Sequence, residues 1–493
     1  MLKHNKKFVY FGIFIFFILV IVGWFDVKKG YGRFSILSTY IPDGIKDVLK
    51  ETIFIIPNLK NQLKIQNAKV EELSVERTKT LETWKDIISN DVNNISAKKI
   101  SEEIIDINTE KLILSKFLLP IPSYTKWGQK SVGYIDEINN KFIFVTGDGN
   151  IFYFDGNNIS KNIISKPVEE EIKLNLFKIK SNLSSLNDGL GEVGKISVKD
   201  ILIKNNQIYI AHINEKKENC HNIEIINAEV NFDYLKFSNF FTYDECFLDA
   251  NIHATGGRMV SFESNKILFT TGDGLKKFGR YSQNVNSFFG KILEIDINTK
   301  KHKLVSMGHR NPQGLFYDRE NNIITSTEHG PAGGDEINII KISKDKIPNY
   351  GWPISSYGVH YPDAIDMFKK QGLLAEILKE QPFHKSHSDY GFEEPIKYYS
   401  PSIGISEIIK MPSNLNKNFK DYYLVGSMGW NIEEFDKTLH YFKLKKEKNK
   451  IEKIGTTIIG ERIRDLKYDK NNNIIIMILE NSPSISFISL DDF

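Results

Sequence analysis

The stretch Asn139–Gly149, NNKFIFVTGDG, joins a polar asparagine turn directly to an apolar strand. The phrase recurs as NNQIYIAHI from Asn205, SNKILFTTGDG from Ser264, NNIITSTEHG from Asn321 and NNNIIIMIL from Asn471. The first four copies begin 57 to 66 residues apart, and repeats of this length that deliver several short strands are typical of β-propeller blades. We therefore expect an all-β, six-bladed propeller, with room for a further blade before the last copy. Tandem β-sandwiches are the structural alternative, whereas the scarcity of long helical patterns argues against α/β folds.

The composition excludes several other classes of protein. The chain has 493 residues, a formal net charge of +3, 33 Phe, 21 Tyr and two Cys. Abundant aromatic residues and a near-neutral charge exclude intrinsic disorder over most of the length. The lysines are scattered and form no basic block, so we expect no nucleic-acid partner.

The run Phe8–Phe25 is apolar and carries no charge over 18 residues. As a helix it would rise about 27 Å, enough to cross a bilayer. Lysines before the run favour a cytoplasmic N-terminus, although basic residues also follow it. A cleaved signal peptide is the alternative, but Trp24 and Phe25 occupy the region where small residues mark a cleavage site.

These features predict three parts of the chain. Residues 1–30 are expected to form a single-pass anchor in the inner membrane. Residues 31–118 are expected to form a helical stalk or linker, because apolar residues recur at helical spacing between Ile45 and Ser89. Residues 119–493 are expected to form the propeller on the periplasmic side.

Cys220 and Cys246 lie 26 residues apart and are the two cysteines of the chain. If the propeller is exported to an oxidising compartment, they can form a disulfide. Such a bridge would stabilise the fold by about 3–4 kcal/mol through loop closure. Two buried free thiols are the alternative.

The segment from Gly308 to Pro353 is rich in residues that suit a binding site. It contains GHRNPQGLFYD, TEHGPAGGDEINII and NYGWP. A Gly-Pro turn followed by adjacent carboxylates supplies oxygen atoms of the kind that calcium prefers. Arg310 and Asn311 supply a planar donor fork and an amide, which suit a carboxylate or quinone oxygen. Each residue alone is also consistent with an ordinary turn or a solvated ion pair.

Together, these phrases resemble the glucose/sorbosone dehydrogenase family, which includes soluble glucose dehydrogenases that use pyrroloquinoline quinone (PQQ) and aldose sugar dehydrogenases. Other phrases agree in the same order: GGRMVSF, FGKILEIDI, YSPSIGIS and ERIRDLKYD. The resemblance implies a six-bladed propeller with PQQ in a cleft on its axis and calcium beneath the cofactor. It also implies oxidation of an aldose or other small alcohol, with an electron acceptor that the sequence does not identify.

The resemblance also implies roles for individual residues. Gly330 and Pro331 would give carbonyl oxygens to the cofactor calcium, whereas Asp335, Glu336 and Tyr350 fall where a second, structural calcium is held.

Other matched positions fall on the cofactor and the substrate. Arg310 and Asn311 would face the quinone oxygens, and Arg462 and Arg464 the cofactor carboxylates. His253 is the candidate base for the substrate hydroxyl, with Arg310 stabilising the oxyanion.

Three departures from the family pattern affect the predicted site. The family's base stands in His-x-Gly-Gly-Arg, but here two residues, Ala254 and Thr255, separate His253 from Gly256. His253 can serve only if the loop bulges by one residue. Gly429 stands near the place of an expected lysine, and an expected Gln-Gly-Gly phrase is absent before residue 200.

The leading hypothesis is therefore a membrane-anchored, PQQ- and calcium-dependent dehydrogenase. The main alternative is a catalytically degenerate propeller that acts as a carbohydrate- or protein-binding scaffold. A calcium-dependent hydrolase is a third hypothesis, without a motif of its own. His384 and His387 are spaced for a metal only on a helix or tight turn, and we expect an exposed loop there.

Overall fold

The computed structural model describes residues 79, 82–87, 92–121, 133–159, 164, 168, 172–183, 198–217, 220–246, 254–274, 276–331, 333–343, 345–358, 386–415, 418–429, 436–445 and 450–490. They belong to one compact unit, Lys79–Phe493. The predicted anchor over residues 1–30 and most of the predicted stalk lie outside the described residues. Within the described residues, no helix is both long and apolar enough to span a membrane.

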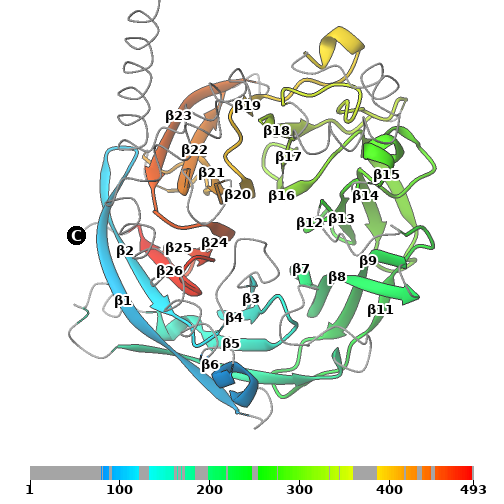
Figure 1. Ribbon diagram of the computed structural model, residues 1–493. Helices are drawn as coiled ribbons and strands as arrows, with labels where there is room; N and C mark the ends of the chain where they lie inside the picture. Colours follow the sequence, from blue (N-terminus) through cyan, green and yellow to red (C-terminus); the bar gives the residue numbers. More distant parts are fainter. Residues whose placement is uncertain are drawn as a thin grey trace, which may run out of the picture. The chain divides into compact units, whose positions relative to one another are not determined.

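Four sheets in the described part of the chain have four strands each (Figure 1). The first contains β7 (Val198–Lys204), β8 (Gln207–Lys217), β9 (Cys220–Glu229) and β11 (Ser238–Phe241). The second contains β12 (Gly256–Phe262), β13 (Lys266–Thr271), β14 (Lys291–Asp296) and β15 (His302–Met307). The third contains β16 (Pro312–Asp318), β17 (Ile323–Glu328), β18 (Asp335–Ile340) and β19 (Lys397–Tyr399). The fourth contains β20 (Ile405–Lys410), β21 (Tyr423–Ser427), β22 (Thr438–Leu444) and β23 (Ile451–Ile458).

A ten-stranded sheet joins the two ends of this unit. One part is β3 (Tyr134–Ile138), β4 (Lys141–Val145), β5 (Ile151–Asp155) and β6 (Lys173–Ser181), with β10 (Tyr234–Leu235) beside β6. The other part is β24 (Ile463–Asp469), β25 (Ile474–Leu479), β26 (Ser484–Ser489) and β2 (Glu110–Leu118). The long strand β1 (Asn94–Ile107) pairs with both β2 and β6 and so connects the two parts. Short 3-10 helices occupy Gly156–Asn158, Lys276–Gln283 and Ser388–Tyr390.

The predicted boundary between stalk and propeller, at residues 118 and 119, is wrong. Strands β1 and β2 lie before this boundary, and β2 pairs with β26 near the C-terminus. Asn108 and Thr109 connect β1 to β2 with φ angles of 49° and 77°, as expected of a two-residue hairpin turn. Sequence alone did not identify this hairpin as part of the propeller, because its pairing partners lie far away in the chain.

One strand of each group of four faces the centre of Figure 1, and these inner strands contact one another in a closed ring. In order around the ring they are β3, β7, β12, β16, β20 and β24, and β24 contacts β3. The strands farther out pack apolar faces against neighbouring sheets. Every residue of β25, Ile474–Leu479, is buried, because it lies between two strands and is covered on both faces.

Hydrogen bonds link each inner strand to the next. At four junctions, that of Leu315 with Glu407 among them, a carboxylate on one strand accepts a bond from a backbone N–H on its neighbour. The other pairs are Ile135 N to Asp465 Oδ2 at 2.9 Å, Ile203 N to Asp136 Oδ2 at 2.6 Å and Met259 N to Asp200 Oδ2 at 2.7 Å. Leu315 N donates to Glu407 Oε1 at 3.1 Å, and Ser406 Oγ donates to Ile463 O at 2.6 Å.

We call these hydrogen bonds between the inner strands, together with the carboxylates that accept them, the belt. Arg258 on β12 completes the belt. Its side chain is 2% exposed, and its Nε donates to the Gln313 carbonyl on β16 at 2.7 Å. Its Nη1 contacts three carboxylates: Asp200 at 3.1 Å, Glu407 at 2.8 Å and Asp465 at 2.9 Å. Burial alone would lower the pKa of Arg258, but these carboxylates outweigh it and raise that pKa. One guanidinium therefore holds strands β7, β16, β20 and β24 around β12.

The substitution Arg258→Met removes the countercharge of three buried carboxylates. We expect the free energy of unfolding in urea to fall by about 3–5 kcal/mol at pH 8. The loss should be smaller at pH 5.5, because burial raises the pKa of Glu407 to about 7 despite Arg258, so a carboxylate without its partner can take up a proton. The control is Arg319→Met, since Arg319 is exposed. Equal losses in the two variants would contradict the central role of Arg258.

Candidate functional site

Several inner strands begin with a β-bulge, where the pairing register skips a residue. Single residues are skipped at Lys199 in β7, Gln313 in β16 and Arg464 in β24. Bulges often re-aim a side chain next to an active site. Arg464 Nη1 lies 3.3 Å from Gln313 Oε1, although β20 separates their strands in the ring. Both side chains therefore project toward the ring axis, at the end where the inner strands begin, which we call the axial end.

Arg462 and Arg464 lie together at the axial end and share one carboxylate. Arg462 Nε donates to Glu480 Oε2 at 2.9 Å, and Arg464 Nε donates to Glu480 Oε1. Glu480 is fully buried. Burial raises the pKa of Glu480, but Arg464 and Arg462 outweigh this effect and the net pKa is lowered. Two guanidinium groups therefore share one buried carboxylate.

Arg310 lies just before β16. Its Nη1 donates to the His329 carbonyl at 3.1 Å, and its guanidinium carbon lies 5.4 Å from the centre of the Trp352 ring. Its backbone N–H donates to Glu328. The Arg310 Nε is buried and has no hydrogen-bond partner among the described residues. An orphaned buried donor of this kind is suited to a ligand oxygen.

Of the loop that carries the predicted base, the structure describes the C-terminal part. His253 lies outside the described residues, and the described chain resumes at Ala254. Ala254 has a φ angle of 55°, and its carbonyl accepts a hydrogen bond from Gly274 N at 2.9 Å. Asn311 Oδ1 accepts a hydrogen bond from Gly256 N at 3.1 Å. Asn311 is thus tied to this loop by its amide oxygen, which leaves the amide nitrogen as its donor to a ligand.

The Gly330–Pro331 turn is fixed by Asp335. Asp335 Oδ1 accepts hydrogen bonds from Gly330 N at 3.0 Å and from Ser402 Oγ at 2.9 Å. Its Oδ2 accepts from the backbone N–H groups of Ile403 at 3.1 Å and Ile405 at 3.0 Å. Both carboxylate oxygens are thus engaged, and Asp335 positions the turn whose carbonyl oxygens are the predicted calcium ligands.

The other residues predicted to hold a second calcium do not converge. Glu336 follows Asp335 on β18, so their side chains point to opposite faces of the strand, and Glu336 Oε1 lies 3.1 Å from His387 Nε2. The Tyr350 hydroxyl donates to Ile339 O at 2.6 Å and accepts from Lys341 N at 3.1 Å. No cluster of three or more His, Cys, Asp or Glu side chains within the described ranges could hold a metal ion. The second calcium site stays a prediction without support from the side-chain positions.

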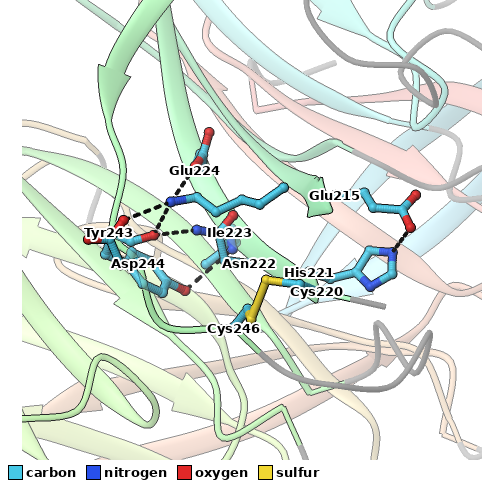
Figure 2. Close-up of a disulfide and its surroundings, with 10 residues drawn as sticks. Glu215, Cys220, His221, Asn222, Ile223, Glu224, Tyr243, Asp244 and Cys246 are labelled. Carbon is cyan, nitrogen blue, oxygen red and sulfur yellow. Dashed lines mark hydrogen bonds and ion pairs between the residues drawn. A yellow bond between two sulfur atoms is a disulfide. The ribbon is translucent and has the colours of Figure 1, made fainter. Parts of the chain in front are cut away.

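The two cysteines form a disulfide, with their Cα atoms 5.3 Å apart (Figure 2). Cys220 begins β9, and Cys246 is the last described residue before the loop that leads to His253. The preceding residue, Glu245, accepts a hydrogen bond from Phe288 N at 2.7 Å. The start of the predicted base loop is therefore tied covalently to one sheet and by a carboxylate to the next.

A groove of about 870 Å³ lies beside the calcium turn. It is lined by Tyr357, by residues 394–403 and by Asp436 and Thr438. Ser402, on its wall, donates from Oγ to Pro331 O at 3.2 Å. The groove therefore borders the predicted calcium site.

The residues at the axial end fit an anionic, quinone-like cofactor. The predicted contacts Arg310, Arg462 and Arg464 occur at this end, where the Arg310 Nε is an orphaned donor, and the Gly330–Pro331 turn supplies carbonyl oxygens. Sequence reasoning missed Glu480, whose signal is only that an acidic residue ends an apolar strand.

The substitution Glu480→Gln leaves two buried guanidinium groups without their carboxylate. We expect the free energy of unfolding to fall by about 3 kcal/mol at pH 7. The folded pKa of Glu480 is lowered, so its contribution is present above the unfolded pKa and is lost as pH falls through the folded pKa. The difference between variant and wild type should therefore shrink in acid. Glu215→Gln, at an exposed position, is the control; a loss that does not change with pH would contradict this account.

Comparisons with known proteins identify the family. The profile of the Glucose / Sorbosone dehydrogenase family matches residues 177–486. Aldose sugar dehydrogenase YliI of Escherichia coli is 28% identical over 247 residues, which are 48% of this chain and 59% of that protein. Quinoprotein glucose dehydrogenase B of Acinetobacter calcoaceticus is 29% identical over 125 residues, 20% of this chain and 25% of that protein.

A solved structure agrees in fold. The soluble aldose sugar dehydrogenase of Escherichia coli, in its apo form, aligns with a TM-score of 0.54 and 16% identity, over 74% of this chain and 98% of that chain. The curated relatives are matched over about half of their length or less. The family profile nevertheless covers more than half of this chain, which belongs to the Glucose / Sorbosone dehydrogenase family.

Proposed function

We propose that this protein is a PQQ- and calcium-dependent dehydrogenase that oxidises an aldose or another small alcohol. The observation that carries the proposal is the gathering of Arg310, Arg462 and Arg464 at the axial end, with the Arg310 Nε buried and unpartnered among the described residues. The names of its relatives, an aldose sugar dehydrogenase and a quinoprotein glucose dehydrogenase, support the same chemistry.

The same proposal includes six blades. The four separate sheets count as four, and the ten-stranded sheet is divided by β1 into two further groups of four strands. The closed sequence of inner strands supports this count, because each group contributes one strand to the ring.

Each residue at the axial end has a role in this proposal. The Arg310 fork and the Asn311 amide donate hydrogen bonds to quinone oxygens, and Arg462 and Arg464 bind carboxylates. The carbonyl oxygens of the Gly330–Pro331 turn hold calcium. When bound, PQQ and calcium supply the hydride acceptor and the cation that polarises it. His253 takes the proton of the substrate hydroxyl.

A degenerate scaffold is the second candidate function, and one observation favours it. Ala254 occupies the position where the family pattern places the base. The left-handed conformation of Ala254, at a φ of 55°, costs an L-residue about 1 kcal/mol and is consistent with one extra residue in the loop. A bulge there supports the dehydrogenase, whereas a loop that turns His253 away supports a scaffold that binds carbohydrate or protein.

The test is turnover by the full chain, purified in detergent and supplied with PQQ and calcium chloride. We expect aldose-dependent reduction of a redox dye, and loss of at least a hundredfold in rate for His253→Ala, the scale of general-base catalysis. The control is His302→Ala, since His302 is exposed on β15. PQQ binding without turnover would favour the scaffold, and unchanged turnover in His253→Ala would exclude His253 as the base.

We further propose that Phe8–Phe25 anchors the protein in the inner membrane with the propeller on the periplasmic side. The uncharged length of this run supports the anchor, and the disulfide supports an oxidising compartment. We expect the full chain to sediment with membranes at high salt, and protease added to spheroplasts to reach the propeller. Recovery of the full chain in the soluble fraction, or protection from protease, would contradict the proposal.

A further inference from the structure

Lys199 occupies the same structural position as the predicted cofactor contact Arg464. Each is the single residue skipped by the bulge at the start of an inner strand, and each is followed by an aspartate of the belt, Asp200 or Asp465. The local sequences, Val-Lys-Asp-Ile and Ile-Arg-Asp-Leu, are alike in pattern.

The side chain of Lys199 is directed to the axial end. Strand β3 stands between β7 and β24 in the ring, yet the charge of Arg464 acts on Lys199. Two groups on non-neighbouring inner strands interact in this way when both project toward the axis. The stem of Lys199 also lies against Gly257 at the start of β12, since a Cβ on Gly257 would lie 2.5 Å from Lys199 Cβ.

Lys199 lacks the carboxylate that Arg464 has. Glu480 follows Leu479, the residue paired with Ile463 just before Arg464. The residue of β8 that corresponds to Glu480 is Ile213. It follows His212, which pairs with Val198 just before Lys199. An isoleucine cannot neutralise the ammonium group, and no carboxylate within the described residues forms an ion pair with Lys199.

The pKa of Lys199 is consistent with the lack of a carboxylate partner. The residue is partly buried. Burial and, next, the positive charge of Arg464 lower the pKa of Lys199 to about 8. A cation kept in an unfavourable environment gains most from a negative ligand that arrives beside it.

We propose that Lys199 is a cofactor-binding residue that holds a carboxylate of the anionic ligand at the axial end. This inference rests on the proposed function. Lys199 supplies, from another strand, the positive charge that is absent at Gly429, where the family pattern places a lysine. It acts with Arg462 and Arg464, so that cations from β7 and from the β24 region approach the ligand from two sides.

The proposal predicts proton-linked binding. Charged or titratable groups on the strands around Lys199 include Asp200 on β7, His212 on β8, Tyr134 on β3, Arg258 on β12, and Arg464 and Asp465 on β24. Both aspartates are bound to Arg258, which leaves Lys199 for the ligand. A carboxylate raises the pKa of Lys199 from about 8, so affinity should fall as pH rises above 8, by up to about tenfold per pH unit.

The experiment is equilibrium dialysis of PQQ against the full chain in detergent with calcium, at pH 7 and at pH 9.5. Lys199→Met should weaken binding about ten- to a hundredfold at pH 7, the scale of a hydrogen bond to a charged group. Lys199→Arg should keep most of the affinity and lose the decline above pH 8, because arginine does not titrate there.

Lys301→Met, at an exposed position, is the control and should bind like wild type. The ligand-free melting temperature of Lys199→Met should stay equal or rise, because an unpaired, partly buried charge is removed. Equal affinity and an equal pH profile for wild type and Lys199→Met would overturn the inference and leave the proposed function standing. Failure of wild type to bind PQQ at any pH would overturn both.

Discussion

The contact of Arg258 with three carboxylates is the constraint on which the rest of the structure depends. A propeller has no single continuous core, so its blades are joined by apolar faces and by whatever links the inner strands. Here most of the links are carboxylates that accept backbone N–H groups, and Arg258 compensates the charge of three of them, Asp200, Glu407 and Asp465. Because buried carboxylates are costly without a partner, the contacts of Arg258 favour this arrangement of the inner strands. That arrangement fixes where each strand begins.

The starts of β7 and β24 have the same local arrangement at the axial end. In β7 and in β24, the aspartate after the bulge joins the belt, and the cation at the bulge points to the axis. The aspartate thus has a structural role, and the neighbouring skipped residue has the proposed binding role. Lys199 and Arg464 each stand next to an aspartate that Arg258 binds, and a proposed cofactor site benefits from such a fixed framework.

The strand pattern could be predicted from the sequence to a large extent. The asparagine turns fall between strands, and Asn139 and Asn140 have φ angles of 50° and 61°, which asparagine tolerates better than most residues. Strand β1 could not be placed, because its role depends on pairing with β6 and, through β2, with the C-terminal strands. Local pattern carries no information about such distant pairing.

The predicted site divides in a similar way. The motif residues Arg310, Arg462 and Arg464 do lie at one end of the ring. Asp335 and Glu336 were expected to share an ion; their side chains point to opposite faces of β18, and the second calcium site stays a prediction. Lys199 carries no motif, and only the register of β7 reveals its equivalence to Arg464.

The central claim is that the axial end holds PQQ and calcium between the arginines and the Gly330–Pro331 turn. The most direct measurement is an experimental structure of the full chain prepared with both. The account predicts PQQ within hydrogen-bond distance of Arg310 and of Arg462 or Arg464, with calcium on the carbonyl oxygens of the turn. A well-ordered axial end without PQQ, or PQQ bound elsewhere on the protein, would contradict it.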